Sequence, residues 1–228
     1  MVQFIESELV LLKKEVSEMW MLVCNQMERA RDAVLGMNVE MAQQVAVREK
    51  RVNAFELKID SDVEDIISLY NPVAVDLRFA LAMLKINSNL ERIGDFAESI
   101  ANFATLEKEP LDAGLLERLR LPEMFEQCLS MLKLAQQALM DENIDLATSV
   151  IPKDNLLDEI NRDASKVIAA YLAQHPDKAL ACLNLVSVFR KLERTGDHII
   201  NIAEEIVFFI DAKVLKHKGN AEEKNLRK

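Results

Sequence analysis

Apolar residues return every three or four positions along most of the chain, which is the spacing of one face of an α-helix. In the first segment, Leu9, Leu12, Val16, Met19 and Val23 follow this spacing. Similar stripes continue to about residue 212. The pattern therefore predicts an all-α protein.

Six long helices are expected, and the prolines help to delimit them. Pro72, Pro110, Pro122, Pro152 and Pro176 fall between or at the start of the periodic segments, where a missing backbone N–H is tolerated. Short connections make successive helices antiparallel, so helical bundles are expected. The predicted helices cover residues 4–35, 39–69, 73–107, 115–141, 144–174 and 177–212.

The composition agrees with this fold class. Half of the 228 residues are hydrophobic and 5% are aromatic, with ten Met. Straight-chain residues lose little rotamer freedom in helices. Only five Gly and five Pro are present, too few for the many tight turns of a sheet protein.

The sequence repeats itself once. Leu90-Glu91-Arg92-Ile93-Gly94-Asp95 returns as Leu192-Glu193-Arg194-Thr195-Gly196-Asp197, and the spacing Glu49-x-x-x-Asn53 returns as Asp154-x-x-x-Asp158. Two homologous units follow from this. We predict two tandem antiparallel three-helix bundles, residues 1–109 and 110–212, followed by a basic tail, 213–228, that is expected to be frayed.

Charge and cysteine usage narrow the functional classes. The net charge of −10 repels nucleic acid and favours cations. Cys24, Cys128 and Cys182 lie far apart on apolar stripes, as buried free thiols of a reducing compartment do. The start of the chain carries early acids, and no eighteen apolar residues run uninterrupted. We expect a cytoplasmic protein without a signal peptide or membrane insertion.

Acidic residues form stripes along four of the predicted helices. Glu91 and Asp95 share one helix face, as do their counterparts Glu193 and Asp197. Packing neighbouring helices of a repeat brings such stripes together on an outer face. Clustered oxygen ligands without thiolates suit divalent or trivalent cations, and several carboxylates can bridge more than one ion. The alternative is a solvated face whose acids pair with the adjacent arginines.

Gly94 and Gly196 lie beside these stripes in the middle of helices. A glycine there costs about 1 kcal/mol relative to alanine, so each marks a close approach of another helix, with or without a metal. His198, His175 and His217 lie off the acidic stripes. Without a Glu-x-x-His pair, a nucleophile elbow or a phosphate-binding glycine loop, the sequence predicts no enzyme.

Taken together, these motifs resemble the PhoU family over nearly the whole chain. The matching features are both Glu-Arg-x-Gly-Asp pentads, the segment Asn201-Ile202-Ala203-Glu204 and the segment from Pro72 to Arg78. The resemblance implies two similar three-helix bundles that bind iron or zinc, in multinuclear clusters, at acidic motifs. It also implies negative regulation of phosphate uptake, in which the protein links a Pst-type transporter, through its ATPase subunit, to a sensor histidine kinase.

Carried over onto this sequence, the family's metal ligands form two sets. The first is Glu49, Asn53, Glu91 and Asp95, and the second is Asp154, Asp158, Glu193 and Asp197, with Asn201 and Glu204 as further contributors.

The first repeat departs from the pattern at Asn53, where a carboxylate would bind metal more strongly, so its site is expected to be weaker. Asp76 and Arg78 are either a partner surface or an Asp at a helix N-terminus beside a paired Arg. A homodimer is expected. A carboxylate-bridged metal enzyme and a metal-free helical scaffold are the alternative functions.

Overall fold

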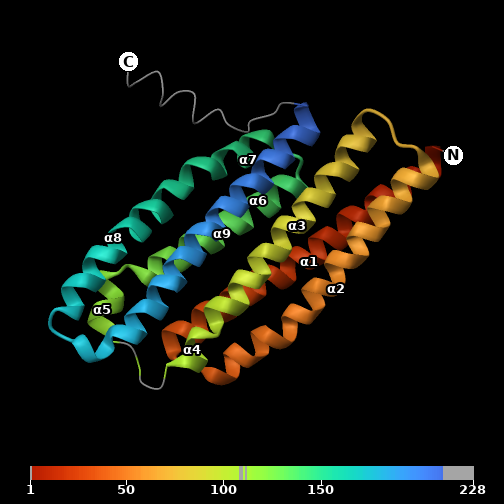
Figure 1. Cartoon of the computed structure of the whole chain (residues 1–228). Coiled ribbons are helices and arrows are strands. Elements are labelled where there is room, and N and C mark those ends of the chain that lie inside the picture. Colours follow the sequence, from red (N-terminus) through yellow and green to blue (C-terminus); the bar gives the residue numbers. More distant parts are fainter. Residues whose placement is uncertain (1, 108–109, 111, 213–228) are drawn as a thin grey trace, which may run out of the picture.

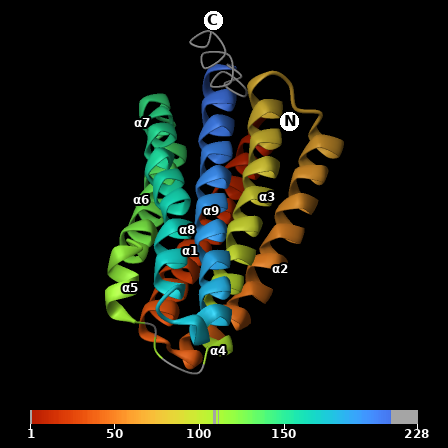
Figure 2. The ribbon, with the colours of Figure 1, turned by 60° about the vertical axis from the view of Figure 1, so that its left-hand side comes forward.

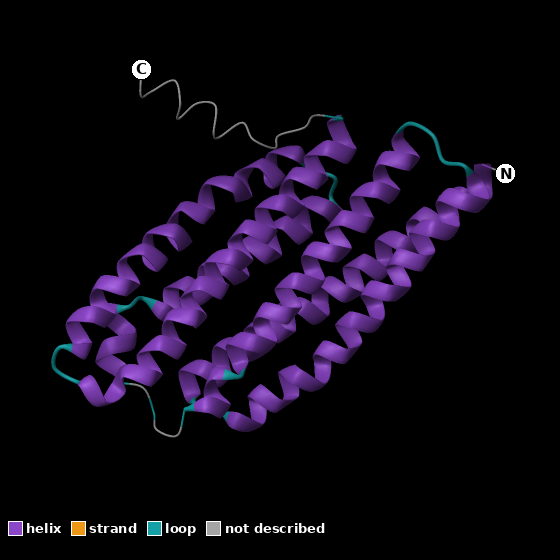
Figure 3. Cartoon of the chain, viewed as in Figure 1, coloured by secondary structure: helices purple, strands orange, loops and turns teal. Residues whose placement is uncertain are grey.

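The computed structural model describes residues 2–107, 110 and 112–212. All regular secondary structure in these residues is helical (Figure 3). The expected frayed tail, 213–228, lies outside the described residues, and so do residues 108, 109 and 111 at the expected boundary between the repeats. The helices are α1 (Val2–Gly36), α2 (Val39–Tyr70), α3 (Val75–Ala101), α4 (Phe103–Leu106), α5 (Ala113–Arg118), α6 (Leu121–Met140), α7 (Ile144–Val150), α8 (Asn155–Leu172) and α9 (Ala179–Asp211), with 3-10 turns η1 (Ile151–Asp154) and η2 (Pro176–Lys178).

These helices form two bundles side by side (Figure 1). In the first, α1, α2 and α3 all pack against one another. In the second, α6 and α9 pack together and against the line formed by α7, η1 and α8. The predicted all-α fold of two three-helix bundles is confirmed.

Three of the six predicted helices are interrupted. The predicted helix 115–141 is divided into α5 and α6 because Arg120 adopts a left-handed conformation, φ 55°, and Pro122 begins the next helix. The predicted helix 144–174 contains η1, since Pro152 supplies no N–H and the backbone tightens to 3-10 geometry there. The predicted helix 73–107 is divided at Asn102 into α3 and α4.

The turn between the first two helices of each repeat has the same construction. Asn38 caps α2 by accepting a hydrogen bond from the N–H of Met41, and Asn143 caps α7 by accepting one from the N–H of Leu146, both at 3.0 Å. The residue before each cap, Met37 or Glu142, has a φ of 48° or 49°. Shared local chemistry thus sets the same entry into the second helix of both repeats.

The two repeats share one continuous hydrophobic core. Helix α3 runs antiparallel to α9: Phe79, near the start of α3, packs edge-on against Phe209, near the end of α9, with ring centroids 5.5 Å apart. On the other side α1 packs against α6, where the fully buried Trp20 donates its indole N–H to the carbonyl of Leu132 at 3.2 Å. In Figure 2, α9 and α3 lie side by side, with α2 beyond α3 and with α6 and α8 on the other side of α9.

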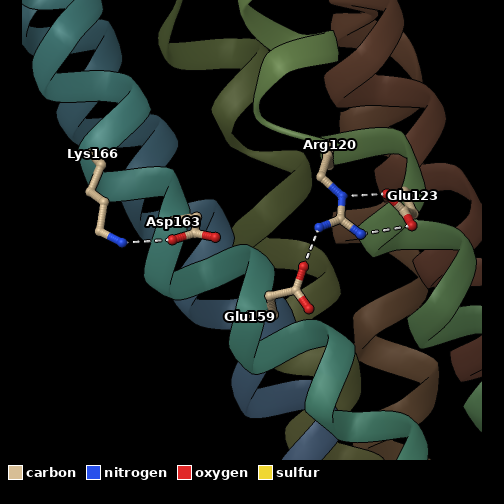
Figure 4. Close-up of polar contacts among 5 residues, drawn as sticks. All are labelled: Arg120, Glu123, Glu159, Asp163 and Lys166. Atoms are coloured by element: carbon tan, nitrogen blue, oxygen red, sulfur yellow. Dashed lines mark hydrogen bonds and ion pairs between the residues drawn. The ribbon is translucent and has the colours of Figure 1, made fainter.

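Ion pairs on the surface connect α6 to α8 (Figure 4). The guanidinium of Arg120, the N-cap residue of α6, pairs with Glu123 on α6 and with Glu159 on α8, each at 2.6 Å. Lys166 pairs with Asp163 one turn away at 2.9 Å. Exposed pairs of this kind contribute little stability singly, so the second bundle depends mainly on its apolar core.

No helix within the described residues is long and apolar enough to cross a bilayer. Cys24, Cys128 and Cys182 are free and buried, as the sequence predicted for structural thiols.

Candidate metal centres

The first acidic cluster lies where α2 meets the middle of α3. Glu49, on α2, is only 4% exposed, and its carboxylate faces Gly94 on α3. A Cβ atom at position 94 would lie 3.0 Å from Oε2 of Glu49 and 3.2 Å from Oε1 of Gln26. The prediction that this glycine marks a close approach is confirmed, and the approaching group is a carboxylate.

Burial is the main influence on Glu49. It raises the pKa of the carboxyl to about 7, and the negative charges of Asp95, Glu98 and Glu91 act in the same direction. A hydrogen bond from Gln26 acts in the opposite direction because it favours the ionised form. The pKa of Glu91 is also raised by burial and by Asp95. These carboxylates therefore lie close enough to interact strongly.

Gln26 is a part of this cluster that the sequence analysis missed. Its side chain is fully buried on α1, and its Nε2 donates to Oε2 of Glu49 at 2.7 Å. Oε1 of Gln26 and Oε1 of Glu49 are both buried without a hydrogen-bond partner. The available signal was a lone amide on the stripe formed by the buried residues Val23, Met27 and Ala30.

The second cluster lies where the end of η1 meets the middle of α9. Asp154 is 8% exposed, and a Cβ atom on Gly196 would lie only 2.1 Å from its Oδ1. Burial raises the pKa of Asp154 to about 7, and Asp158, Asp197 and Glu193 raise it further. Oδ1 of Asp154 is buried without a hydrogen-bond partner. Both repeats thus place a buried carboxylate against a glycine.

The expectation that the acidic stripes lie on an outer face is wrong for Glu49 and Asp154, which are buried. Helical periodicity fixes the direction of a side chain around its own axis, whereas the neighbouring helix decides whether that direction is covered. Around each buried acid, Glu91, Asp95 and Glu193 are half-buried and Asp197 is exposed. Each cluster therefore runs from one covered carboxylate out to solvent.

The remaining predicted ligands lie farther out. Asn53 and Asp158 are exposed, one turn beyond Glu49 and Asp154 on the same helical line. Asn201 and Glu204 are half-buried, one and two turns beyond Asp197 on α9. The structure thus brings Asp154, Asp158, Glu193 and Asp197 together and places Asn201 and Glu204 farther along α9.

The alternative, in which the acids pair with the adjacent arginine, holds in part for the first repeat. Arg92 lies 3.7 Å from Glu91 and 3.6 Å from Asp95, both long contacts. In the second repeat Arg194 instead stacks over the ring of Phe96, 5.0 Å from its centroid. Burial raises the pKa of Glu193 and of Asp197, and the positive charge of Arg194 acts in the opposite direction, but Arg194 forms no ion pair with either among the described residues.

Within the described ranges, no three Asp, Glu, His or Cys side chains are arranged so that they could hold a metal ion as they stand. Two observations still fit the donor chemistry of a cation. All the clustered groups are oxygen ligands, and each cluster holds a buried carboxylate oxygen without a hydrogen bond, which normally calls for an explanation such as an ion.

The other candidate residues lie elsewhere. His198 is half-buried between the repeats, where its Nδ1 is 2.8 Å from Oδ1 of Asn89, so it is a satisfied rim histidine. Asp76 is in the first turn of α3, as the structural alternative expected. Arg78 makes no ion pair with any described residue, and its Nε is buried without a partner, so the expected pairing of this arginine is not found.

Comparison with known proteins identifies the duplicated architecture. The PhoU domain family matches twice, over residues 16–104 and 121–206. A phosphate-specific transport system accessory protein PhoU homolog of Thermotoga maritima is 30% identical over 92% of this chain and 90% of its own length. The Pseudomonas aeruginosa homolog is 30% identical over 95% and 89%.

Solved structures agree in fold over nearly their whole length. The crystal structure of PhoU from Pseudomonas aeruginosa superposes with a TM-score of 0.85 at 29% identity, covering 91% of this chain and 99% of that one. The phosphate transport system regulatory protein PhoU from Streptococcus pneumoniae gives 0.84 at 25% identity, covering 93% and 99%. The chain therefore belongs to the PhoU family.

Proposed function

We propose that this chain is a negative regulator of phosphate uptake and phosphate-starvation signalling. It acts in the cytoplasm as a non-enzymatic, metal-binding adaptor between a Pst-type phosphate transporter and a sensor histidine kinase. The names of its relatives as accessory proteins of the phosphate-specific transport system support the regulatory role. The observation that carries the metal-binding part of the proposal is the buried carboxylate opposite a glycine in both repeats.

Metal binding is the first part of this proposal. Glu49, Glu91 and Asp95, with Asn53 at the rim, would hold ions at the first centre. Asp154, Asp158, Glu193 and Asp197 would hold them at the second, with Asn201 and Glu204 alongside. Bound iron or zinc would supply positive charge to offset the repulsion between these carboxylates. The second centre, with four carboxylates and no arginine pair, is the stronger.

Partner docking is the second part. The second acidic cluster ends in the exposed acids Asp158 on α8 and Asp197 on α9, which suit a basic partner surface at short range. The transporter ATPase subunit and the kinase are the proposed partners. A homodimer would present two copies of each acidic cluster.

The regulatory proposal is tested by binding to partners from the same genome. The purified chain should retain the Pst-type ATPase subunit or the cytoplasmic part of the sensor kinase in a pull-down, and an Asp158→Asn/Asp197→Asn variant should retain less. Glu64→Gln, a variant of an exposed acid outside both acidic clusters, is the matched control and should bind as the wild type does. Binding of neither partner would contradict the adaptor role.

The same material tests the partner surface at Asp76 and Arg78. Replacing Arg78 with Gln should weaken retention of one partner if this segment contacts it, while thermal unfolding reports any structural cost. Unchanged retention would leave Asp76 as a helix N-terminal residue with no partner role. Sedimentation analysis of the wild type tests the proposed homodimer, which a monomer at all concentrations would contradict.

A further inference from the structure

We propose that Gln26 is a positioning residue of the first centre: from α1 it holds the carboxylate of Glu49 in the orientation in which this carboxylate binds a cation. This inference rests on the metal binding proposed above. It makes the first centre a three-helix construction, whereas the carboxylates of the second come from η1, α8 and α9. The two centres are therefore unequal in design as well as in charge.

The contacts of Gln26 carry the inference. Its Nε2 is 2.7 Å from Oε2 of Glu49, within the range of a charge-assisted hydrogen bond. Both side chains are more than nine-tenths buried, so water does not compete for this bond. With Oε2 held by Gln26, Oε1 of Glu49 is left buried and unpartnered, and it is the oxygen available to a cation.

Gly94 makes room for this arrangement. A Cβ at that position would meet Oε2 of Glu49 and Oε1 of Gln26 at 3.0 and 3.2 Å, so the glycine admits both the acid and the amide that holds it. A buried amide with an unpartnered oxygen destabilises the folded state. Such a residue in the middle of an apolar stripe calls for an explanation, and orienting Glu49 supplies one.

The second repeat provides the comparison. Asn38 and Asn143 are equivalent helix caps, and twelve residues before each lie Gln26 and Met131. Both are fully buried on the first helix of their repeat. Met131 cannot donate a hydrogen bond, and Oδ1 of Asp154 is buried without a hydrogen-bond partner among the described residues. The amide is therefore a property of the first centre alone.

Hydrogen bonds to ligating groups fix ligand orientation, and their loss typically weakens metal affinity by about 10–100-fold. Gln26→Met replaces the amide with the residue of the second repeat at nearly equal volume. It should weaken cation binding at the first centre by that factor and leave the second centre unchanged. The effect acts through orientation, so it should persist at pH 8, where the carboxylates are ionised.

The test uses metal-free full-length chain and Mn²⁺, with free ion measured by electron paramagnetic resonance. Asp197→Asn weakens the second centre and provides the parent in which the first centre is observed. Adding Gln26→Met should raise the Kd of this parent by about 10–100-fold. Adding Met131→Gln, the reciprocal change at the second centre, should leave that Kd unchanged. Thermal unfolding without metal shows whether each variant is folded.

The possible results test the role of Gln26 separately from metal binding at the first centre. A parent that binds no Mn²⁺ would show that the first centre binds no cation, which removes both. A parent that binds, with an unchanged Kd after Gln26→Met, would overturn the role of Gln26 alone. Should Gln26→Met fail to fold, side-chain amide NMR of the wild type decides: the Gln26 amide signals must shift as diamagnetic Zn²⁺ fills the first centre, and their constancy would overturn the inference.

Discussion

Gly196 on α9 lies so close to Asp154 that a methyl group on its α-carbon would sit 2.1 Å from the carboxylate Oδ1. The equivalent pair, Gly94 and Glu49, leaves 3.0 Å. Real Cβ contacts are longer than the first of these distances, so a side chain at position 196 would require Asp154 or Leu157 to move. In both repeats, the helix that packs over the buried acid has a glycine at that position, so it contributes no side chain there.

The two glycines should respond differently to alanine. At Gly196 the added carbon would also meet Leu157 at 2.6 Å, and overpacking of this kind costs about 1–3 kcal/mol, more than the helix propensity gained. At Gly94 the contacts of 3.0–3.2 Å roughly cancel the gain of about 1 kcal/mol. Urea unfolding should therefore show Gly196→Ala clearly destabilised and Gly94→Ala close to the wild type.

Gly36 is the control for this comparison because a Cβ there meets nothing within 4 Å. Gly36→Ala should be neutral or stabilising by up to about 1 kcal/mol. A Gly196→Ala variant as stable as Gly36→Ala would mean that the close approach between α9 and η1 does not exist in solution.

The buried acids should make stability depend on pH. The pKa values of Glu49 and Asp154 are raised from 4.5 and 3.8 to about 7 in the folded chain. The folded state therefore binds their protons more tightly than the unfolded state does. Their contribution to the free energy of unfolding is greatest near pH 4, falls as the pH rises to about 7 and is constant above that.

Replacing Glu49 separates its contribution to the pH dependence of stability from the contributions of the other carboxylates. Glu49→Gln should match the wild type at pH 5 and become more stable by about 1–3 kcal/mol at pH 8, measured by urea unfolding of metal-free protein. Glu123→Gln is the control: Arg120 lowers the pKa of this exposed acid, so any pH trend should have the opposite sign. A Glu49→Gln advantage that is equal at both pH values would contradict the assigned burial.

Trp20 should be important for holding the repeats together. It is fully buried between α1 and α6 and bonded to the carbonyl of Leu132. Trp20→Phe should cost about 1–3 kcal/mol through the lost hydrogen bond and the space left behind, measured by far-UV circular dichroism during chemical unfolding. The neighbouring Met21 is 56% exposed, so Met21→Ala should change stability by less than about 0.5 kcal/mol. Equal costs would contradict the α1–α6 interface.

The repeat and the glycines could be predicted from sequence because each left a visible pattern. The pentads containing Gly94 and Gly196 gave the duplication, and the cost of a mid-helix glycine pointed to close packing. The break at Arg120 left a weaker pattern. Pro122 indicates a helix start nearby, but the left-handed backbone of Arg120, φ 55°, is one that a residue other than glycine seldom adopts.

The depth of the candidate centres was also beyond the sequence. Glu49 and Asp154 belong to stripes that read as polar, and only the packing of α3 and α9 over them buries these two members. Gln26 was missed for the reverse reason, because one amide within an apolar stripe hardly changes the periodicity. Its partner, Glu49, lies 23 residues away, and pairing across helices is set by the fold.

The central claim is that the two acid clusters bind metal, and elemental analysis of the chain purified without chelators or a metal-affinity tag tests it most directly. The wild type should carry more than one equivalent of iron or zinc per chain, and an Asp95→Asn/Asp197→Asn variant should lose most of it while remaining folded. A wild type that contains no metal and takes up none on titration would contradict the account and leave both clusters as sites of helix packing and docking.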